Sequence, residues 1–539
     1  DYVDPDFGTG AVKITPAHDL NDFELGRRHH LEEINILNDD GTTNQNAGVY
    51  SGMTVLDCRR KVLEDLQEKE LLKKIEDYHH TIGHCYRCDS IIEPYLSQQW
   101  FIRIQELAKP AIEAVEKNES SFIPKRWSKV YFEWMYNIKD WCISRQLWWG
   151  HRIPVWYCID CNETIVQMEE PLECTKCQSR EIVQDKDVLD TWFSSALWPF
   201  STLGWPDQTD DLKDYYPTSL LITGFDIIFF WVARMMMMGL KFMGDIPFEK
   251  VFINPLIKDI EGKKMSKSKG NAIDPLLMID QYGADALRMT LASLTIQANY
   301  IRLSRDKIET FRNFTNKIWN VARFTLTHLS DFNPKEIEIE KLTFTLFDQW
   351  ILNRLNKTVK EVTVSLENYR FSDAAMTIYE FTWNYFCDWY IELVKETLYE
   401  NNKITERKTA QYVLWYVLDH LLRLLHPFMP FITEEIWQKI PHKELSISVS
   451  IWPKYNKKQN IRNIEEQVII IQEVIKTIRN IKAEMNIPLT RDIDVHIKVV
   501  DNNKEKLIND HLSYIKNLAH IQSFQLGPSL ERPECSATG

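Results

Sequence analysis

Apolar positions along the chain change their spacing near residue 305. From about residue 95 to residue 300, short apolar runs that read as strands alternate with helical patterns, as in 219–223, 251–258 and 284–294. Alternation of this kind is typical of a parallel sheet with helices between its strands. We therefore predict an α/β fold for this part of the chain.

The first eighty residues differ from this part in composition and pattern. The first fifty are rich in Gly, Thr, Asn and Asp, with short β-like runs such as 10–15, and residues 58–76 read as a charged amphipathic helix. Glycine and asparagine clusters between short apolar runs are typical of turns between strands. This pattern predicts short β-like runs joined by turns in the first fifty residues, followed by a helix.

Helical periodicity dominates after residue 305. Leu346, Trp350 and Leu355 share one helical face, and prolines at 427 and 430 close a later apolar helix. Residues 306–458 are therefore expected to form an all-α bundle. The polar stretch 452–463 reads as a linker. A helix with an isoleucine face and a strand at 493–499 are expected in the C-terminal region, 459–539.

Length and composition describe a multidomain globular protein. A chain of 539 residues, 44% hydrophobic and 26% charged, is too long for one core and is expected to form three to five domains. The net charge of −13 argues against coating nucleic acid by bulk electrostatics, although 64 Lys and Arg leave room for a local basic face. We find no export signal and no apolar run long enough to span a bilayer, and so expect a cytosolic protein without membrane contact.

Six of the ten cysteines fall in three Cys-x-x-Cys pairs. Two pairs, Cys158 with Cys161 and Cys174 with Cys177, are close enough to form one four-thiolate zinc knuckle within residues 155–185. Four unrelated thiols would be the alternative. The third pair, Cys85 and Cys88, has no second pair near it.

A lysine-rich loop runs from 262 to 271 between an expected strand and an expected helix. Loops at the carboxyl ends of parallel strands are where such sheets bind ligands. Glycines at both ends allow the backbone to move, lysines can neutralise phosphates, and Ser266 and Ser268 can add hydrogen bonds. A solvated basic turn is the alternative for such a run.

The order Lys264-Met265-Ser266-Lys267-Ser268 resembles the signature loop of class I aminoacyl-tRNA synthetases. The resemblance implies a Rossmann-like catalytic fold over 83–305 and a loop that closes on the triphosphate of ATP, bound with Mg²⁺. Lys264 and Lys267 would stabilise the charge that develops as the amino-acid carboxylate attacks the α-phosphate and pyrophosphate leaves. Positioning and electrostatics would carry this catalysis, with no covalent enzyme intermediate.

Four further motifs, at 140–151, 190–195, 223–231 and 284–288, resemble the valyl branch of that family. By this resemblance, Trp192, Ile227 and Trp231 would line the valine pocket, and Gly224 with Asp226 would meet the ATP ribose or the amino group. Two indoles could narrow a pocket enough to reject isoleucine, whereas an apolar slot alone discriminates one methylene by only about 1–3 kcal/mol. For Trp231, core packing is the alternative. Departures from the family pattern occur at 254–255 and 298–300.

Residues 8–22 resemble the hydrolytic editing domain of the same enzymes, so 1–82 would be the C-terminal part of this β-rich domain. A valine pocket cannot strongly reject threonine, and a second site would hydrolyse threonyl-tRNA(Val). Asp19 would hold the α-amino group, Asp22 would select the threonine hydroxyl, and Lys13 and Thr15 would orient the ester. A Gly/Asp-rich turn with an aspartate helix cap is the alternative.

The same resemblance gives the remaining expectations. The bundle would bind the anticodon of tRNA(Val), and Cys85 with Cys88 would be half of a zinc site. The His-x-Gly-His signature of the family is not found in the sequence, nor is a C-terminal coiled-coil arm. We therefore expect an incomplete copy, inactive by itself, of a valine-activating ligase that is monomeric at full length. An isoleucyl-type synthetase and a non-catalytic, zinc-containing RNA-binding derivative are the alternatives.

Overall fold

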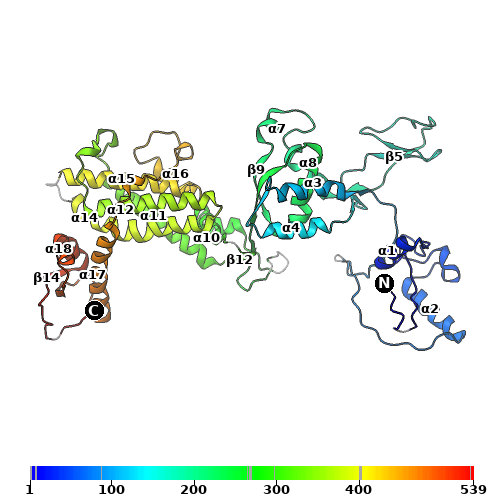
Figure 1. Cartoon of the computed structure of the whole chain (residues 1–539), viewed down its shortest axis with the longest axis horizontal. Coiled ribbons are helices and arrows are strands. Elements are labelled where there is room, and N and C mark those ends of the chain that lie inside the picture. Colours follow the sequence, from blue (N-terminus) through cyan, green and yellow to red (C-terminus); the bar gives the residue numbers. More distant parts are fainter. Residues whose placement is uncertain are drawn as a thin grey trace. The chain divides into compact units, whose positions relative to one another are not determined.

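The computed structural model describes all residues except 1, 2, 7, 8, 86, 87, 264, 266–269, 297, 400–403 and 535. The chain divides into two compact units. Figure 1 labels the main helices and strands of both. The first unit consists of Asp1–Ile104 and Lys139–Ser194, and the second of Gln105–Ile138 and Ser195–Gly539.

The N-terminal part of the first unit is mainly helical and irregular. It contains α1 (Leu20–His29), the 3₁₀-helix η1 (Gln45–Tyr50) and α2 (Val55–Glu68). The expected β-like run 10–15 is not a strand, and the described residues of 1–82 pair only through isolated bridges such as Leu37 with Thr43. Helix α2 ends before residue 76 because Glu70 adopts a positive φ of 56°, which a helix cannot continue.

Short antiparallel pairs form the rest of the first unit. Strand β5 lies between β6 and β7, β1 pairs with β3, and β4 pairs with β8. The bounds are β1 (Phe101–Ile102), β3 (Trp141–Cys142), β4 (Ser144–Arg145), β5 (Val155–Cys158), β6 (Thr164–Val166), β7 (Ile182–Gln184) and β8 (Val188–Leu189). Helix α5 (Thr191–Ala196) begins directly after β8 and leads into the second unit.

A parallel sheet in the second unit confirms the α/β prediction. Its order is β2 (Ser121–Ile123), β10 (Phe248–Asn254) and β9 (Thr218–Gly224), and the register of β10 with β9 ends on Asn254 opposite Gly224. Strand β11 (Leu256–Lys258) continues the chain and pairs in parallel with β12 (Tyr300–Arg302). The helices of this region are α3 (Ile104–Glu116), α4 (Trp127–Tyr136), α6 (Trp198–Ser201), α7 (Asp210–Tyr215), η2 (Phe225–Ile227), η3 (Ile228–Ala233), α8 (Arg234–Phe242), α9 (Pro275–Tyr282) and α10 (Ala284–Leu294).

The predicted helical bundle follows β12. Its helices are α11 (Arg305–His328), η5 (Pro334–Glu336), η6 (Ile339–Lys341), α12 (Leu346–Glu367), α13 (Phe371–Glu380), η7 (Phe381–Tyr390), α14 (Ile391–Tyr399), α15 (Ile404–Leu425), α16 (Pro430–Trp437), η8 (Ile447–Val449) and η9 (Lys457–Gln459). A capping box between Thr345 and Asp348 fixes the start of α12. Pro430 opens α16, where proline's missing N–H costs nothing.

The C-terminal region packs on the bundle. It contains α17 (Ile464–Glu484), the parallel strands β13 (Ile493–Lys498) and β14 (Ile521–Gly527), and helices α18 (Asn502–Asp510) and α19 (Leu512–Ala519). One continuous apolar core extends from Met278 to Ile521, so α9, α10, the bundle and this region are held together by shared burial. In the part of the chain that the structure describes, no helix is long and apolar enough to cross a membrane.

Candidate active site and metal centre

The carboxyl end of β9 is built around a glycine. A Cβ at Gly224 would lie 2.7 Å from Oδ1 of Asp226 and 3.1 Å from a methyl carbon of Leu256, so no larger residue fits without displacing them. The exposed Asp226 carboxylate therefore lies directly over the end of the strand. Ligands of parallel sheets bind at this edge, and the geometry suits recognition of a hydroxyl or amino group.

Two of the three predicted pocket residues follow Gly224 in the same unit. Ile227 ends η2 and Trp231 lies within η3, which has the wide turns of a π-helix. Both side chains are half-buried. The Trp231 indole N–H donates to the carbonyl of Ser195 at 3.1 Å, and its ring centre lies 6.0 Å from that of Trp198. A hydrogen bond thus orients Trp231, and its ring remains partly accessible to solvent. A residue that only filled the core would need neither feature.

Trp192 lies in the other compact unit, near the start of α5. Its backbone N–H donates to Oδ1 of the buried Asp190 at 3.2 Å. Asp190 also accepts from the indole of Trp141 at 3.0 Å and from Arg145 at 2.8 Å through Oδ2. This network fixes the backbone that carries Trp192.

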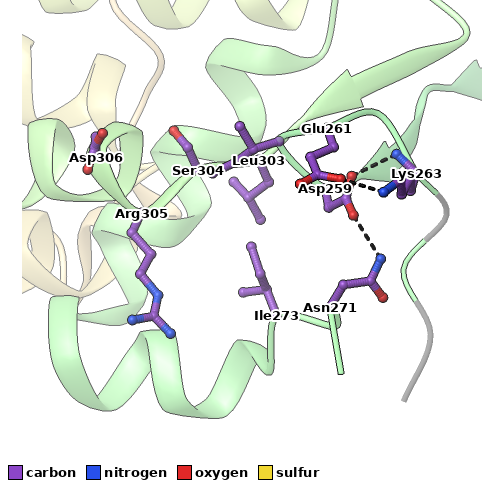
Figure 2. Close-up of a pocket in the computed structure, with 10 residues that line it drawn as sticks. Asp259, Glu261, Lys263, Asn271, Ile273, Leu303, Ser304, Arg305 and Asp306 are labelled. Atoms are coloured by element: carbon purple, nitrogen blue, oxygen red, sulfur yellow. Dashed lines mark hydrogen bonds and ion pairs between the residues drawn. The ribbon is translucent and has the colours of Figure 1, made fainter. Parts of the chain in front are cut away.

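The signature loop itself is largely outside the described residues: Lys264, Ser266, Lys267 and Ser268 are not among them. The described residues on either side of it line a cavity of about 690 Å³ (Figure 2). The wall consists of Asp259, Ile260, Glu261, Lys263, Asn271, Ile273, Leu303, Ser304, Arg305 and Asp306. The cavity thus has carboxylates and cations on its wall, beside the segment where phosphate-binding lysines are predicted.

The four cysteines of the predicted knuckle converge at the β5–β7 sheet. Their sulfurs all lie within 4.8 Å of one another, with Cys158 and Cys177 at 3.5 Å and Cys161 and Cys174 at 3.6 Å. A tetrahedral zinc with Zn–S bonds of about 2.3 Å needs sulfurs about 3.8 Å apart. The spacing fits a closed four-thiolate site.

Backbone amides point at one of these sulfurs. The backbone N–H groups of Cys177 and Lys176 lower the pKa of the Cys174 thiol to about 7. The N–H of Lys176 lies 3.4 Å from that sulfur. Because a thiolate is the form that binds metal, these amides favour coordination.

Each cysteine pair begins in the same kind of turn. The N–H of Cys158 donates to Glu163, and the N–H of Asn162 donates back to Cys158, both at 2.9 Å. Cys174 repeats these two bonds with Ser179 and Gln178, and Cys85 repeats them with Ser90 and Asp89. The residue after the second cysteine has a positive φ in all three turns: 56° at Asn162, 61° at Gln178 and 60° at Asp89.

The Cys85 turn therefore has the backbone of a metal knuckle, and the Ser90 hydroxyl lowers the pKa of the Cys88 thiol to about 7. Among the described residues, however, only the Cys158 quartet gathers three or more ligand atoms within metal-binding range. That Cys85 and Cys88 are half of a zinc site stays a prediction.

Three of the four predicted editing residues lie together. Oδ2 of the buried Asp22 accepts from the backbone N–H of Thr15 at 2.8 Å and lies 3.3 Å from its hydroxyl, and Lys13 Nζ lies 3.2 Å from the same hydroxyl. Asp19 instead caps α1, accepting from the N–H groups of Asn21 at 2.8 Å and Asp22 at 3.0 Å. The alternative of an aspartate helix cap is therefore observed for Asp19. Its editing role stays a prediction.

Sequence reasoning gave no role to His18, Asp259 or Asn271. His18 accepts from the N–H of Ile36 at 3.0 Å through Nε2, and its Nδ1 lies 3.0 Å from the carbonyl of Pro94, so it joins three segments. Asp259 stands three residues before the lysine-rich loop 262–271 and Asn271 is the last residue of that loop, and these positions were the only signals for the pair.

Comparison with known proteins assigns two successive parts of the chain to two families. Residues 20–304 match the family of class I tRNA synthetases (I, L, M and V), and residues 348–497 match the anticodon-binding domain of tRNA ligases. Because the first match covers more than half of the chain, the chain belongs to the class I tRNA synthetases.

Its curated relatives include valine–tRNA ligases. That of Thermotoga maritima is 53% identical over 538 residues and that of Syntrophotalea carbinolica 51% identical over 540, in each case over 100% of this chain and 60% of the relative. The chain thus spans about 60% of the length of these relatives. A methionyl-tRNA synthetase from Mycobacterium tuberculosis, solved with methionyl-adenylate, shares the fold with a TM-score of 0.50 at 18% identity, over 66% of this chain and 65% of that one.

Proposed function

We propose that this chain belongs to a valine–tRNA ligase, which activates valine with ATP and transfers it to tRNA(Val). The observation that carries the proposal is the match to valine–tRNA ligases over the whole chain at about half identity. It agrees with the site residues at the carboxyl end of β9 and with the signature loop after β11.

Activation needs the valine carboxylate to be held in line with the α-phosphate of ATP. Asp226 would hold the valine ammonium group or the ATP ribose, and Gly224 leaves the room for it. Lys264 and Lys267 would stabilise the charge on the phosphates as pyrophosphate leaves, with Ser266 and Ser268 as hydrogen-bond donors. Mg²⁺ would travel with the ATP and neutralise its phosphate oxygens.

The indoles of Trp192 and Trp231 would form the walls of the pocket that selects the valine side chain. The hydrogen bond from Trp231 to Ser195 fixes one indole, and the Asp190 network fixes the backbone at Trp192. Ile227 would add the apolar floor. Rigid aromatic walls can exclude isoleucine because they cannot shift to admit its extra methylene.

The remaining parts would support the same reaction. The Cys158 quartet would hold a structural Zn²⁺. Lys13, Thr15, Asp19 and Asp22 would belong to a site that hydrolyses threonyl-tRNA(Val), and the α11–α16 bundle would bind the anticodon. We propose a cytosolic location and a monomeric state.

A chimaera tests this proposal with the whole chain in place. In it, these 539 residues replace the matching region of the Thermotoga maritima valine–tRNA ligase. Pyrophosphate exchange should depend on valine, and the Trp231→Ala variant should lose discrimination against isoleucine by about 10-fold or more. Trp319→Ala, a change at a tryptophan exposed on α11, is the matched control and should leave exchange unchanged.

The alternatives give different results. Exchange driven equally well by isoleucine would indicate an isoleucyl-type enzyme. A folded chimaera that binds tRNA(Val) without any amino-acid-dependent exchange would indicate the non-catalytic RNA-binding derivative.

A further inference from the structure

Helix α16 of the bundle takes its N-terminal cap from α10. The residue before α16 is Met429, which is buried and has an apolar side chain that cannot cap a helix. Oδ1 of Asp285 accepts from the N–H of Phe431 at 3.3 Å, and Oδ2 accepts from the N–H of Ile432 at 2.7 Å. These amides are the free donors of a helix start, where a carboxylate is favourable. Asp285 therefore joins α10 to the bundle.

Arg288 holds the chain just before α16. It lies about one helical turn after Asp285, so both side chains are on the same face of α10. Its Nε donates to the carbonyl of Phe428 at 3.1 Å, and its Nη2 donates to the carbonyl of Pro427 at 2.9 Å. A guanidinium can bridge two adjacent carbonyls because its donors have a fixed geometry. The two side chains of α10 thus hold the turn between α15 and α16 by its carbonyls and by its N–H groups.

The turn between α15 and α16 is also braced within the bundle. The hydroxyl of Thr433 lies 2.8 Å from the carbonyl oxygen of Met429 and 2.8 Å from Nδ1 of His426. Nε2 of the same histidine lies 2.9 Å from the hydroxyl of Ser448 in η8. A contact that fixes this turn therefore fixes the ends of two bundle helices together.

The C-terminal end of α10 is linked to the parallel sheet. The hydroxyl of Ser372 in α13 donates to the carbonyl of Ser293, near the end of α10, at 2.7 Å. The preceding residue, Phe371, packs edge to face on Phe252 of β10, with ring centres 5.2 Å apart. Strand β10 pairs with β9, whose carboxyl end carries Gly224. Helix α10 therefore connects the sheet of the candidate site with the α15–α16 turn.

Polar contacts fix the geometry of this junction more closely than its apolar core can. Helix α10 shares a core with the bundle, but the burial of apolar surface has no preferred direction. Asp285 is only 6% exposed, and burial raises the pKa of its carboxyl, whereas the two N–H groups of α16 oppose that shift. A buried carboxylate without its donors is costly, so the arrangement of α10 and α16 that supplies them is favoured.

We propose that Asp285 and Arg288 are positioning residues for the charging of tRNA. They fix the bundle relative to the sheet, so that one tRNA can bind by its anticodon while its acceptor end reaches the site at the end of β9. This inference rests on the proposed ligase function, and neither residue needs to touch tRNA, valine or ATP. Two contacts made by one molecule strengthen each other only when their spacing on the protein is suitable. Loss of the junction should therefore raise the KM for tRNA(Val) and leave the activation of valine unchanged.

Three variants remove the junction to different degrees. Asp285→Ala removes both acceptor oxygens, whereas Asp285→Asn keeps one and should have a smaller effect. Arg288→Lys keeps the charge, but a single ammonium cannot reproduce the fork that holds two carbonyls. If Asp285→Ala does not fold, the two milder variants carry the test. Asp280→Ala, at an exposed carboxylate of α9, is the matched control.

Hydrogen exchange on the chain itself tests the junction without any enzyme activity. The amides of 431–434 should exchange at least about fivefold faster in Asp285→Ala than in the parent chain, because their cap is lost. Asp285→Asn should give a smaller increase, and Asp280→Ala should match the parent. Unchanged hydrogen exchange at 431–434 in Asp285→Ala overturns the junction.

The chimaera tests the role of the junction in charging. Asp285→Ala should raise the KM for tRNA(Val) about 10-fold, and Arg288→Lys should raise it at least about threefold. Valine-dependent pyrophosphate exchange should stay within about twofold of the parent in both variants. The Kd of a transcript of the anticodon stem and loop alone should also stay within about twofold, because this RNA needs only the bundle.

Other results overturn the proposal in distinguishable ways. If pyrophosphate exchange falls as far as charging, or if the stem-loop binds as weakly as the whole tRNA, the two side chains only support local folding and the positioning role is wrong. An unchanged KM for tRNA(Val) with faster hydrogen exchange at 431–434 retains the cap and also overturns the positioning role. If the parent chimaera shows no valine-dependent pyrophosphate exchange, the ligase proposal fails and the positioning role fails with it. Hydrogen exchange still decides in that case whether Asp285 caps α16.

Discussion

Arg145 donates a hydrogen bond from Nη2 to Oδ2 of Asp190 at 2.8 Å, and the Asp190 side chain is only 7% exposed. The same aspartate accepts from the N–H of Trp192, so one buried charge links β4 to the start of the helix that carries a predicted pocket residue. A buried carboxylate of this kind is stable only while its donors remain.

Asp190→Ala should release the start of α5. The variant removes the acceptor for Trp192, Trp141 and Arg145 at once, and we expect a local loss of about 3 kcal/mol. Hydrogen exchange of peptides covering 190–196 should become faster by at least about 10-fold. The exposed carboxylate variant Asp207→Asn should leave these peptides unchanged. Unaltered exchange in Asp190→Ala would show that the network does not hold the helix start.

Metal content should follow the cysteine quartet. The purified chain is expected to hold one zinc, measured by plasma mass spectrometry, because four thiolates converge at tetrahedral spacing. Cys174→Ser should abolish it. Cys58→Ser should leave it intact, and so should Cys85→Ser, since no third ligand joins the Cys85 pair among the described residues. Zinc that survives Cys174→Ser would contradict the assignment.

Asp348 should make the bundle less stable as the pH rises. Burial raises the pKa of this carboxyl above its ordinary value of 3.8, so the folded state binds its proton more tightly than the unfolded state does. The contribution of this group to stability is therefore complete below about pH 4 and falls as the pH rises through the folded pKa. Chemical unfolding followed from about pH 4 to pH 8 should show this fall, and Asp348→Asn should remove it.

The Tyr390 hydroxyl should reduce the free-energy cost of ionising the buried Asp348 carboxyl. Its hydroxyl donates to Oδ1 of Asp348 at 2.6 Å in the buried core. Tyr390→Phe leaves that oxygen without this donor and should cost about 1.5–3 kcal/mol in the free energy of unfolding. Tyr399→Phe, at a mostly exposed position, serves as the control and should cost almost nothing. Equal effects of the two changes would refute the role of the Tyr390 contact.

Lys482 should anchor the C-terminal strands to α17. Its side chain is fully buried, and Nζ lies 2.6–3.2 Å from the carbonyl oxygens of Leu489, Arg491, Ala519 and His520, so its three N–H groups are shared among four acceptors. Lys482→Met leaves these carbonyls without that donor and should cost about 3 kcal/mol, seen as faster hydrogen exchange in β13 and β14. Lys476→Met, at an exposed position of the same helix, is the control. Protection that survives Lys482→Met would exclude the anchor.

Local patterns in the sequence predicted the parts of the molecule that depend on spacing and burial. The run at 251–258 contains the end of β10, which is buried between two strands, and all of β11, and the paired Cys-x-x-Cys motifs determine which sulfurs meet. The strand expected at 10–15 was wrong because extended residues form a strand only when a partner pairs with them, and none does among the described residues.

Polar contacts between distant residues could not be predicted in this way. Asp190 and Arg145 are 45 positions apart, and Asp259 meets Asn271 across a loop whose path the sequence does not specify. The carbonyls around Lys482 Nζ come from separate turns of the chain. They meet there because α19 packs on α17. Such networks follow from tertiary packing, and only their residue types are visible in the sequence.

Charging of tRNA(Val) by the chimaera tests the central claim most directly. Valine should be attached to a tRNA(Val) transcript, and Lys267→Ala should lower the rate about 10²–10³-fold while tRNA binding is retained, because the lysine acts on the transition state. Attachment of another amino acid in preference to valine, or full charging by Lys267→Ala, would contradict the account.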